Sequence, residues 1–327
     1  MLIDSFGRVH DYLRISLLDR CNFRCTYCMP HDLPKGSFAY AKRMSAEEID
    51  FISSVFVNLG IKKIRLTGGE PLIRKDVDAI LLSLSKYPIE LALTTNGSLL
   101  HKHIDILKQA GIKSVNVSLD SLDPEKFYAI TKRNEFHKVL ANIHLLLHEG
   151  FKVKLNAVVL ANENENEILN FVQLTRDWPL HVRFIEFMPF DGNSWNQNQV
   201  VSHKKIVDLI QHHYEVNKIE DAVHDTAKKY KVPGYEGSFA VISTISEPFC
   251  GDCNRLRLTS DGKLKNCLFS KEEVDLLSPL RKGEDIIPLI ESCVIAKKAE
   301  RGGQFNFENK ILQPQTIKNR SMIAIGG

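Results

Sequence analysis

The sequence has no long apolar run, no strong net charge and few cysteines outside two short stretches. No stretch reaches the roughly 18 uncharged apolar residues of a membrane span, and no apolar core of a secretory signal follows Met1. We therefore expect a cytoplasmic protein that does not bind a membrane. A formal net charge of +3 over 327 residues gives no basic field of the kind that nucleic-acid binders carry, so that class is excluded. Any anion must be bound by locally placed cations.

The cysteines are too unevenly placed for a disulfide framework. Six of the seven lie in two tight groups, and thiols stay reduced in the cytoplasm, so metal binding is the better interpretation. Cys293 belongs to neither group, and we expect it to be a small buried hydrophobic residue. The hydrophobic fraction of 43% is typical of a globular protein, and the length suits one large α/β domain or one plus an appendage.

The first thiol group consists of Cys21, Cys25 and Cys28. Thiolates this close share one soft metal centre or remain free, and three ligands are one fewer than a closed structural zinc site takes. A 4Fe-4S cluster held by three cysteines leaves one iron open to a substrate or cosubstrate. A zinc site with a distant fourth ligand and three unrelated buried thiols are the alternatives.

The second thiol group consists of Cys250, Cys253 and Cys267. The stretch 255–267 predicts a β-hairpin with a two-residue turn at 261–262. Pairing outward from that turn sets Cys267 opposite Leu256, near Cys253. Because no fourth protein ligand is evident, a second cluster with an open iron is favoured over zinc.

Arg255 and Arg257 would share one face of this hairpin. Beside a metal site, two guanidinium groups indicate an anionic substrate held by bidentate contacts. The alternative is that both are edge-strand charges that face water.

Six apolar, β-branched segments alternate with stretches of helical period. The expected strands are 12–17, 62–67, 89–95, 112–119, 151–160 and 180–187. This alternation implies a parallel sheet with right-handed crossovers. Since six units fall short of the eight in a closed barrel, we expect an α/β fold with an open partial (β/α)6 TIM-like barrel over 1–190. The remainder, 191–327, begins with a polar linker and is expected to be a C-terminal α+β region that binds the second cluster.

In such a barrel, chemistry collects at the C-terminal ends of the strands. Gly68, Gly69 and Glu70 follow the second expected strand. The two glycines would let a ligand approach the backbone, and the carboxylate could take an ammonium group, although a tight turn alone would also explain them. Cations on parallel strands are costly unless they meet an anion, so some should point into the barrel mouth. The candidates are Arg14, Lys63, Arg65 and Lys154, and solvation at a strand end remains an alternative for Lys63.

The spacing Cys-x3-Cys-x2-Cys, with Tyr27 before the last cysteine, resembles the radical S-adenosylmethionine (SAM) superfamily. With the segments 4–8, 12–16, 64–71 and 250–257, the chain is similar to the GTP 3′,8-cyclase family, molybdenum cofactor biosynthesis protein A. The resemblance implies a lyase acting in the first step of molybdenum cofactor biosynthesis. It implies that a 5′-deoxyadenosyl radical takes the C3′ hydrogen of GTP, which then closes to (8S)-3′,8-cyclo-7,8-dihydro-GTP.

The resemblance also assigns roles by motif position. It implies two 4Fe-4S clusters, ligated by Cys21, Cys25 and Cys28 and by Cys250, Cys253 and Cys267. It implies SAM contacts from Tyr27, Gly68, Gly69, Glu70, Ser118 and Met188. It implies GTP contacts from Arg14, Lys63, Arg65, Thr94, Lys154, Arg255, Leu256 and Arg257. Catalytic roles fall to Arg14, Arg255, Arg257, Gly326 and Gly327.

The two glycines follow an apolar tail, 321–325, that is unusual for a solvated chain end. We expect this tail to insert toward Arg14 and the substrate, and a frayed tail is the alternative. The resemblance further implies a homodimer, a reductant such as flavodoxin or ferredoxin, and transfer of the product to cyclic pyranopterin monophosphate synthase. The rival interpretations are a radical SAM peptide-modifying enzyme, an iron-sulfur electron carrier and a zinc-stabilised binding protein.

Overall fold

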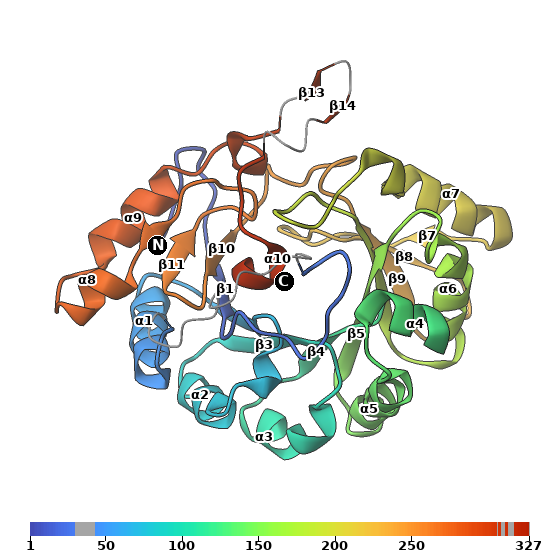
Figure 1. The fold of residues 1–327 in the computed structure, drawn as a ribbon, viewed down its shortest axis with the longest axis horizontal. Helices are drawn as coiled ribbons and strands as arrows, with labels where there is room; N and C mark the ends of the chain where they lie inside the picture. The colour runs from blue at the N-terminus through green and yellow to red at the C-terminus, as the bar shows by residue number, and fades with distance from the viewer. Residues whose placement is uncertain (30–42, 306, 309–310, 313–316, 327) are drawn as a thin grey trace.

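The computed structural model describes residues 1–29, 43–305, 307–308, 311–312 and 317–326. In this part of the chain one 12-stranded sheet has the order β12-β11-β10-β1-β2-β3-β4-β5-β6-β9-β8-β7. The sheet curves without closing, and its inner face surrounds the centre of the molecule (Figure 1). None of the described helices is long and apolar enough to cross a membrane.

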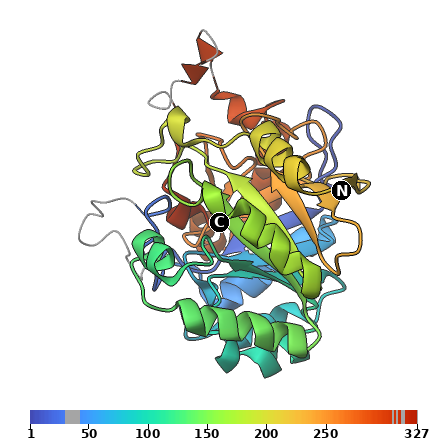
Figure 2. The same ribbon diagram turned by 90° about the vertical axis from the view of Figure 1, so that its right-hand side faces the viewer.

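Six parallel strands form the middle of the sheet. They are β1 Tyr12–Ser16, β2 Lys63–Thr67, β3 Glu90–Thr95, β4 Ser114–Ser118, β5 Lys152–Val159 and β6 His181–Glu186. The helices between them are α1 Ala46–Asn58, α2 Val77–Leu84, α3 Ile104–Gln109, α4 Pro124–Thr131, α5 Phe136–His148 and α6 Ile168–Asp177. These helices cover the outer face of the sheet (Figure 1 and Figure 2). The open partial (β/α)6 barrel expected from the sequence is therefore confirmed.

Local sequence signals explain where two helices begin. The Ser45 side chain accepts a hydrogen bond from the Glu48 amide, and the Glu48 carboxylate accepts one from the Ser45 amide, so α1 starts on a capping box. Asp123 caps α4 in the same manner, accepting from the amides of Glu125 and Lys126. The sequence analysis did not anticipate α4, although an aspartate before Pro124 is a standard helix start.

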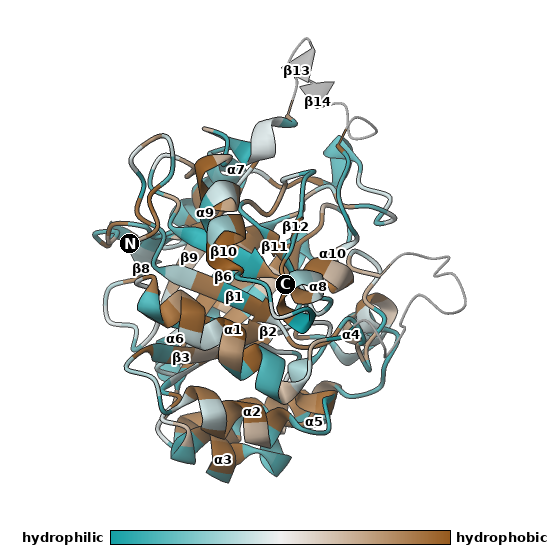
Figure 3. Ribbon diagram, turned by 90° about the vertical axis from the view of Figure 1, so that its left-hand side faces the viewer, coloured by the Kyte–Doolittle hydropathy of each residue, from teal (hydrophilic) through white to brown (hydrophobic). Residues whose placement is uncertain are grey.

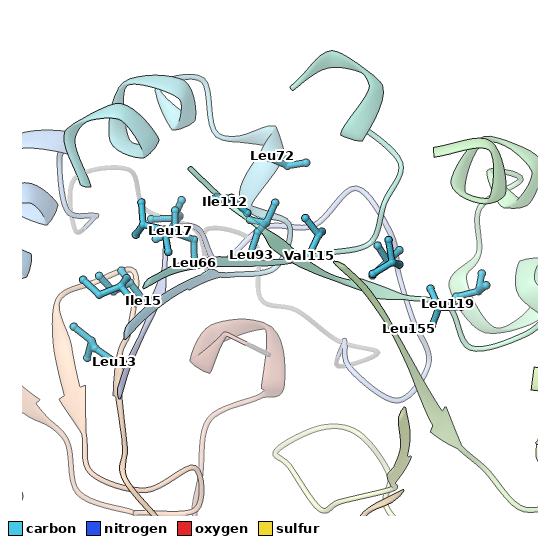
Figure 4. Packing of buried hydrophobic residues seen from close by; sticks show 14 of the residues in the cluster. Leu13, Ile15, Leu17, Leu66, Leu72, Leu93, Ile112, Val115, Leu119 and Leu155 are labelled. Carbon is cyan, nitrogen blue, oxygen red and sulfur yellow. The ribbon is translucent and has the colours of Figure 1, made fainter. Parts of the chain in front are cut away.

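The hydrophobic core lies between the sheet and its outer helices. Leu13 and Ile15 of β1, Leu66 of β2 and Leu93 of β3 are fully buried and point to the same side of the sheet (Figure 4). Each outer helix carries both hydrophobic and hydrophilic residues, as suits one buried face (Figure 3). Because side chains alternate along a strand, the residues between these positions face inward, and Arg14 is one of them.

The C-terminal region extends the same sheet at both edges. Beside β6 lies β9, Ser238–Ile242, which is parallel to β6 and is followed by antiparallel β8 Lys228–Lys231 and β7 Asn217–Lys218. Beside β1 lies β10, Arg255–Leu258, which is parallel to β1 and is followed by antiparallel β11 Lys263–Lys265 and β12 Val274–Asp275. The remaining elements are α7 His203–His213, α8 Leu277–Arg281, α9 Ile287–Ile295, β13 Phe307–Glu308, β14 Ile311–Leu312 and α10 Met322–Ile325. The domain division at 190/191 stays a prediction.

The predicted hairpin exists, but its predicted register is wrong by one residue. Arg257 pairs with Lys265, whereas a two-residue turn would have set it opposite Asn266. The loop holds three residues, 260–262, because the Thr259 amide donates to the Lys263 carbonyl and Gly262 adopts a φ of +72°. This is the geometry of a three-residue hairpin loop with a left-handed last residue.

Candidate active site

A single cavity of about 390 Å³ lies along the inner face of the sheet and receives both thiol groups. The predicted site residues that line it are Arg14, Cys21, Cys25, Tyr27, Cys28, Lys63, Arg65, Gly68, Gly69, Thr94, Ser118, Lys154, Met188, Cys250, Cys253, Arg255, Arg257 and Cys267. Residues more than 200 positions apart in the sequence meet there because β10 pairs directly with β1. The structure therefore brings most of the predicted site together.

The first thiol group lies in the loop that follows β1. The Cys21 sulfur accepts hydrogen bonds from the Phe23 amide at 3.3 Å and from the Asn96 side-chain amide at 3.7 Å. Burial raises the pKa of Cys21 to about 11 and that of Cys28 to about 12. Such thiols stay protonated at neutral pH unless a metal takes the place of the proton. Their environment therefore suits metal coordination better than free reactive thiols.

The second thiol group lies between β9 and the end of the C-terminal hairpin. The Cys250 sulfur accepts from the Arg301 amide at 3.4 Å, and the Cys253 sulfur accepts from Lys297 Nζ at 3.4 Å. Although burial raises the pKa of Cys253, the positive charges of Lys297 and Arg255 lower it to about 7. Nitrogen donors aimed at cysteine sulfurs are typical of iron-sulfur sites, where they tune the cluster.

The donor set in both places fits an iron-sulfur cluster. All six cysteines are free thiols, and in the described part of the chain no three His, Cys, Asp or Glu side chains are placed to hold one metal ion. A 4Fe-4S cluster binds each thiolate through a different iron, so its cysteines stand farther apart than those around one zinc. Each group offers three thiols, the number that holds a 4Fe-4S cluster with one iron open.

The two glycines after β2 line the cavity, as predicted, and also have a role inside the chain that the sequence analysis did not anticipate. A Cβ on Gly69 would lie 2.2 Å from the Arg20 carbonyl oxygen, and one on Gly68 would lie 2.6 Å from the Leu18 carbonyl oxygen. The amide of Gly69 donates to Leu18, at 2.6 Å. The close neighbour is thus the chain itself, and the glycines let this loop hold the segment that leads into the first thiol group.

Replacing Gly69 by alanine is expected to destabilise the protein by about 3 kcal/mol, because backbone carbonyls cannot move aside as a flexible side chain can. Chemical denaturation of the reduced, metal-free protein measures the change. Gly251→Ala is the matched control, since nothing lies within 4 Å of a Cβ there. Equal unfolding free energies for the two variants would contradict the proposed packing of the loop.

Two of the predicted SAM and GTP contacts, Glu70 and Leu256, do not line the cavity. Glu70 is fully buried, and its carboxylate accepts hydrogen bonds from the amides of Leu72 and Asn96 and from the Thr95 hydroxyl. Burial raises its pKa to about 7. These contacts hold the loop after β2 to the loop after β3. Leu256 is also fully buried and packs in the hydrophobic core, because it alternates with the two arginines that face the cavity.

The basic residues form a cationic wall, which we define as Arg14, Lys63, Arg65, Lys154, Arg183, Arg255 and Arg257. The sequence analysis missed Arg183 of β6, although it alternates with buried Val182 and Phe184 just as the predicted cations alternate with core residues. In the described structure its Nε and Nη2 are buried without a hydrogen-bond partner. Such an unpaired guanidinium aimed into a cavity indicates a missing anion.

Burial and, to a smaller extent, mutual repulsion lower the pKa values of two members of the cationic wall. Burial, helped by Arg183, lowers the pKa of Lys154 to about 8. Burial, helped by Arg65, lowers that of Arg183 to about 9. An anion bound between these residues would relieve the repulsion, so the cavity is built for a ligand with several negative charges.

Two aromatic residues of the cavity have partners that fix their hydroxyl groups. Tyr12 accepts from Arg65 Nε at 2.7 Å, and although burial raises its pKa, Arg65 and Arg14 lower it to about 7. Tyr27 donates to Asp120 at 2.7 Å. Neither Tyr12 nor Asp120 was among the predicted site residues. Asp120 lies two residues after Ser118, the predicted SAM contact at which β4 ends.

The C-terminal tail inserts into the barrel as far as the structure describes it. α10 lies at the centre of the open barrel (Figure 1), Ile325 is buried, and the Gly326 carbonyl accepts a hydrogen bond from Arg257 Nη1 at 2.8 Å. A Cβ on Gly326 would lie 2.7 Å from Thr67 Oγ1 and 2.8 Å from the Ser16 Cβ. Gly327 is outside the described residues. The predicted insertion of the tail therefore agrees with the position of Gly326.

Comparison with known proteins gives two family matches. Residues 15–175 match the Radical SAM superfamily, and residues 180–302 match Molybdenum Cofactor Synthesis C. The GTP 3′,8-cyclase of Peptoclostridium acidaminophilum is 42% identical, covering 100% of this chain and 98% of that protein. The mitochondrial GTP 3′,8-cyclase of Arabidopsis thaliana is 44% identical, covering 100% of this chain and 84% of that protein.

Other relatives are longer. Molybdenum cofactor biosynthesis protein 1 of Mus musculus is 46% identical over 99% of this chain, and the chain spans 51% of its length. Among solved structures, Streptococcus suis SuiB bound to S-adenosylmethionine has a TM-score of 0.62 at 14% identity, covering 96% of this chain and 73% of that one. At that identity the likeness concerns the fold alone, and it agrees with the open barrel described above.

Proposed function

The chain belongs to the GTP 3′,8-cyclase family of radical SAM proteins, and we propose that it converts GTP to (8S)-3′,8-cyclo-7,8-dihydro-GTP, the first step of molybdenum cofactor biosynthesis. One observation carries this proposal: two thiol groups and a cationic wall line the same cavity. A volume of about 390 Å³ suits small molecules rather than a protein surface. The triphosphate of GTP would supply the negative charges that the cationic wall requires, and its guanine and ribose would fill the remaining volume of the cavity.

Each thiol group would hold its own cluster, and the two clusters would have different roles in the reaction. Cys21, Cys25 and Cys28 would hold one 4Fe-4S cluster, and Cys250, Cys253 and Cys267 a second. When bound, that first cluster would supply the electron for reductive cleavage of SAM and so the radical chemistry that would remove the C3′ hydrogen of GTP. SAM would be bound beside it by the residues that line the cavity there, namely Tyr27, Gly68, Gly69, Ser118 and Met188. Glu70 would act by holding this loop in place.

The cationic wall would bind and orient the triphosphate. Arg14 lies on β1 and Arg65 and Lys63 on the neighbouring β2, whereas Lys154 and Arg183 lie on the neighbouring strands β5 and β6. Arg255 and Arg257 reach the cavity from β10. The guanine would face the second thiol group, and the inserted tail would keep Arg257 oriented through the Gly326 carbonyl. These residues would exclude water and hold the ribose of GTP in one orientation in the cavity.

The rival interpretation is a peptide-modifying radical SAM enzyme. SuiB, whose fold is similar, has also been solved bound to precursor peptide SuiA, with a TM-score of 0.61. That likeness carries no substrate information at 14% identity. Buried cations such as Arg183 and Lys154 would be unpaired against a neutral peptide, at a high desolvation cost. The charge of the cavity therefore favours the nucleotide.

Replacing Lys154 by alanine is expected to weaken GTP binding by about 1.5 to 3 kcal/mol, the usual contribution of a charged hydrogen bond, with little change in SAM binding. Lys152→Ala is the matched control, because Lys152 is exposed on the same strand and does not line the cavity. Anaerobic calorimetry gives both affinities. Equal GTP affinity for the two variants would remove Lys154 from the site.

The wild-type protein should also discriminate by phosphate number. GTP should bind more tightly than GDP, and GDP more tightly than guanosine, because each lost phosphate leaves more of the cationic wall unpaired. The same calorimetry tests this order. Affinity that does not depend on phosphate number would mean that the wall does not hold the triphosphate.

We further propose the partners that such a reaction requires. A low-potential donor such as flavodoxin or ferredoxin would supply the electron, and cyclic pyranopterin monophosphate synthase would take the product. A homodimer and a cytoplasmic location remain predictions from the sequence. Size-exclusion chromatography with light scattering tests whether the protein is a homodimer.

A further inference from the structure

A buried lysine outside the cationic wall contacts the second thiol group. Lys297 follows α9, and only 3% of its surface is exposed. Its ammonium group donates to the Cys253 sulfur at 3.4 Å, to the Cys253 carbonyl at 3.5 Å and to the Arg255 carbonyl at 3.1 Å. Three acceptors match the three protons of an ammonium group.

No carboxylate compensates this charge. Within the described residues, no Asp or Glu forms a salt bridge with Lys297, although a buried cation is costly unless an anion faces it. Burial lowers its pKa, and the charges that oppose this effect are those of Cys253 and Cys267. The anion that pairs with Lys297 is therefore the second thiol group itself.

The surrounding contacts hold this lysine in place. Arg8 donates to the Cys250 carbonyl at 2.8 Å, and also to the carbonyls of Ala299 at 2.8 Å and Lys298 at 2.9 Å. Asp4 in turn accepts from Arg8 Nε at 2.6 Å. The segment 4–8 thus fastens the chain just after Lys297 to the loop that carries Cys250, which gives this N-terminal motif a structural purpose.

We propose that Lys297 is a positioning residue that raises the reduction potential of the cluster on Cys250, Cys253 and Cys267. One-electron reduction adds one negative charge to the cluster, and a fixed ammonium group beside the Cys253 sulfur stabilises the reduced form more than the oxidised form. This inference rests on the proposed function, because it requires the second cluster.

The test is an anaerobic redox titration of the reconstituted full-length protein, with dithionite as the reductant and electron paramagnetic resonance as the readout. Lys297→Met should lower the midpoint potential of the second cluster by at least about 59 mV, a tenfold change for one electron. Lys297→Arg, which keeps the charge, should stay near the wild type. Lys298→Met is the matched control, because Lys298 is the exposed neighbour. The same titration of a Cys25→Ala protein assigns the signal to the second cluster.

Iron and sulfide analysis distinguishes failure of the proposed function from failure of the role proposed for Lys297. A wild-type protein without a second cluster would overturn the proposed function. A Lys297→Met protein that holds both clusters and keeps the wild-type potential would overturn only the role of Lys297. If Lys297→Met fails to hold the cluster, Lys297→Gln replaces it, since glutamine donates a hydrogen bond without a charge. A wild-type potential in Lys297→Gln would contradict the proposal, and a lowered potential would support it.

Discussion

Replacing Cys25 by alanine is expected to abolish reductive cleavage of SAM. Three thiolates are the minimum that hold the first cluster while leaving one iron open, and Cys25 faces the cavity together with Cys21 and Cys28. Without the cluster no electron reaches SAM, so production of 5′-deoxyadenosine should fall to background. Anaerobic incubation with SAM, GTP and dithionite, followed by chromatographic analysis, measures the product.

Two comparison variants make this result specific. Cys293→Ala should keep the wild-type rate, because Cys293 is buried beside the Leu264 carbonyl and belongs to neither thiol group. Cys253→Ala should still cleave SAM without coupling but lose the cyclised nucleotide. A Cys25→Ala protein that forms 5′-deoxyadenosine at the wild-type rate would refute the assignment of the first site.

Replacing Gly326 by alanine is expected to reduce cyclised product on the order of 100-fold, the loss that a misplacement of about 1 Å can cause. The new Cβ would collide with Thr67 and Ser16, so the tail would shift and its carbonyl would leave Arg257. Neither thiol group contacts Gly326 directly, so iron content and uncoupled SAM cleavage should persist.

Gly283→Ala is the control for this variant. Gly283 also has a positive φ, at +77°, but nothing lies within 4 Å of a Cβ there. Parallel assays of 5′-deoxyadenosine and cyclised nucleotide separate loss of coupling from loss of the first cluster. A Gly326→Ala protein that makes cyclised product at the full rate would mean that the inserted tail has no part in the reaction.

The barrel was predictable because its signals are local. Alternation of β-branched strands with amphipathic helices depends on short periodicities, and every expected barrel strand lies within two residues of an observed one at each end. The hairpin register was harder to predict, since it depends on whether the loop after Thr259 holds two or three residues. That choice is made by backbone hydrogen bonds around Gly262, which the residue order alone does not specify.

Site residues that belong to sequence motifs could be predicted, whereas residues that join the site only through the folding of distant segments were harder to predict. The cysteines and most of the cations were identified from their spacing and strand positions. Arg183 carried the same strand signal and was overlooked. Lys297 could not be identified from the sequence, because its role depends on the contacts that its ammonium group makes with Cys253 and Arg255 in the folded chain. The glycines after β2 were identified as special, but their close neighbours are the carbonyls of Leu18 and Arg20, which only the folded chain reveals.

The most direct test of the central claim uses GTP deuterated at C3′. Reconstituted protein is incubated anaerobically with SAM, dithionite and the labelled GTP, and both products are analysed by mass spectrometry. If the cavity holds GTP with its ribose between the two thiol groups, 5′-deoxyadenosine should gain one deuterium, and cyclised nucleotide should form in equal amount. Deuterium that stays in the nucleotide while 5′-deoxyadenosine accumulates would contradict the account.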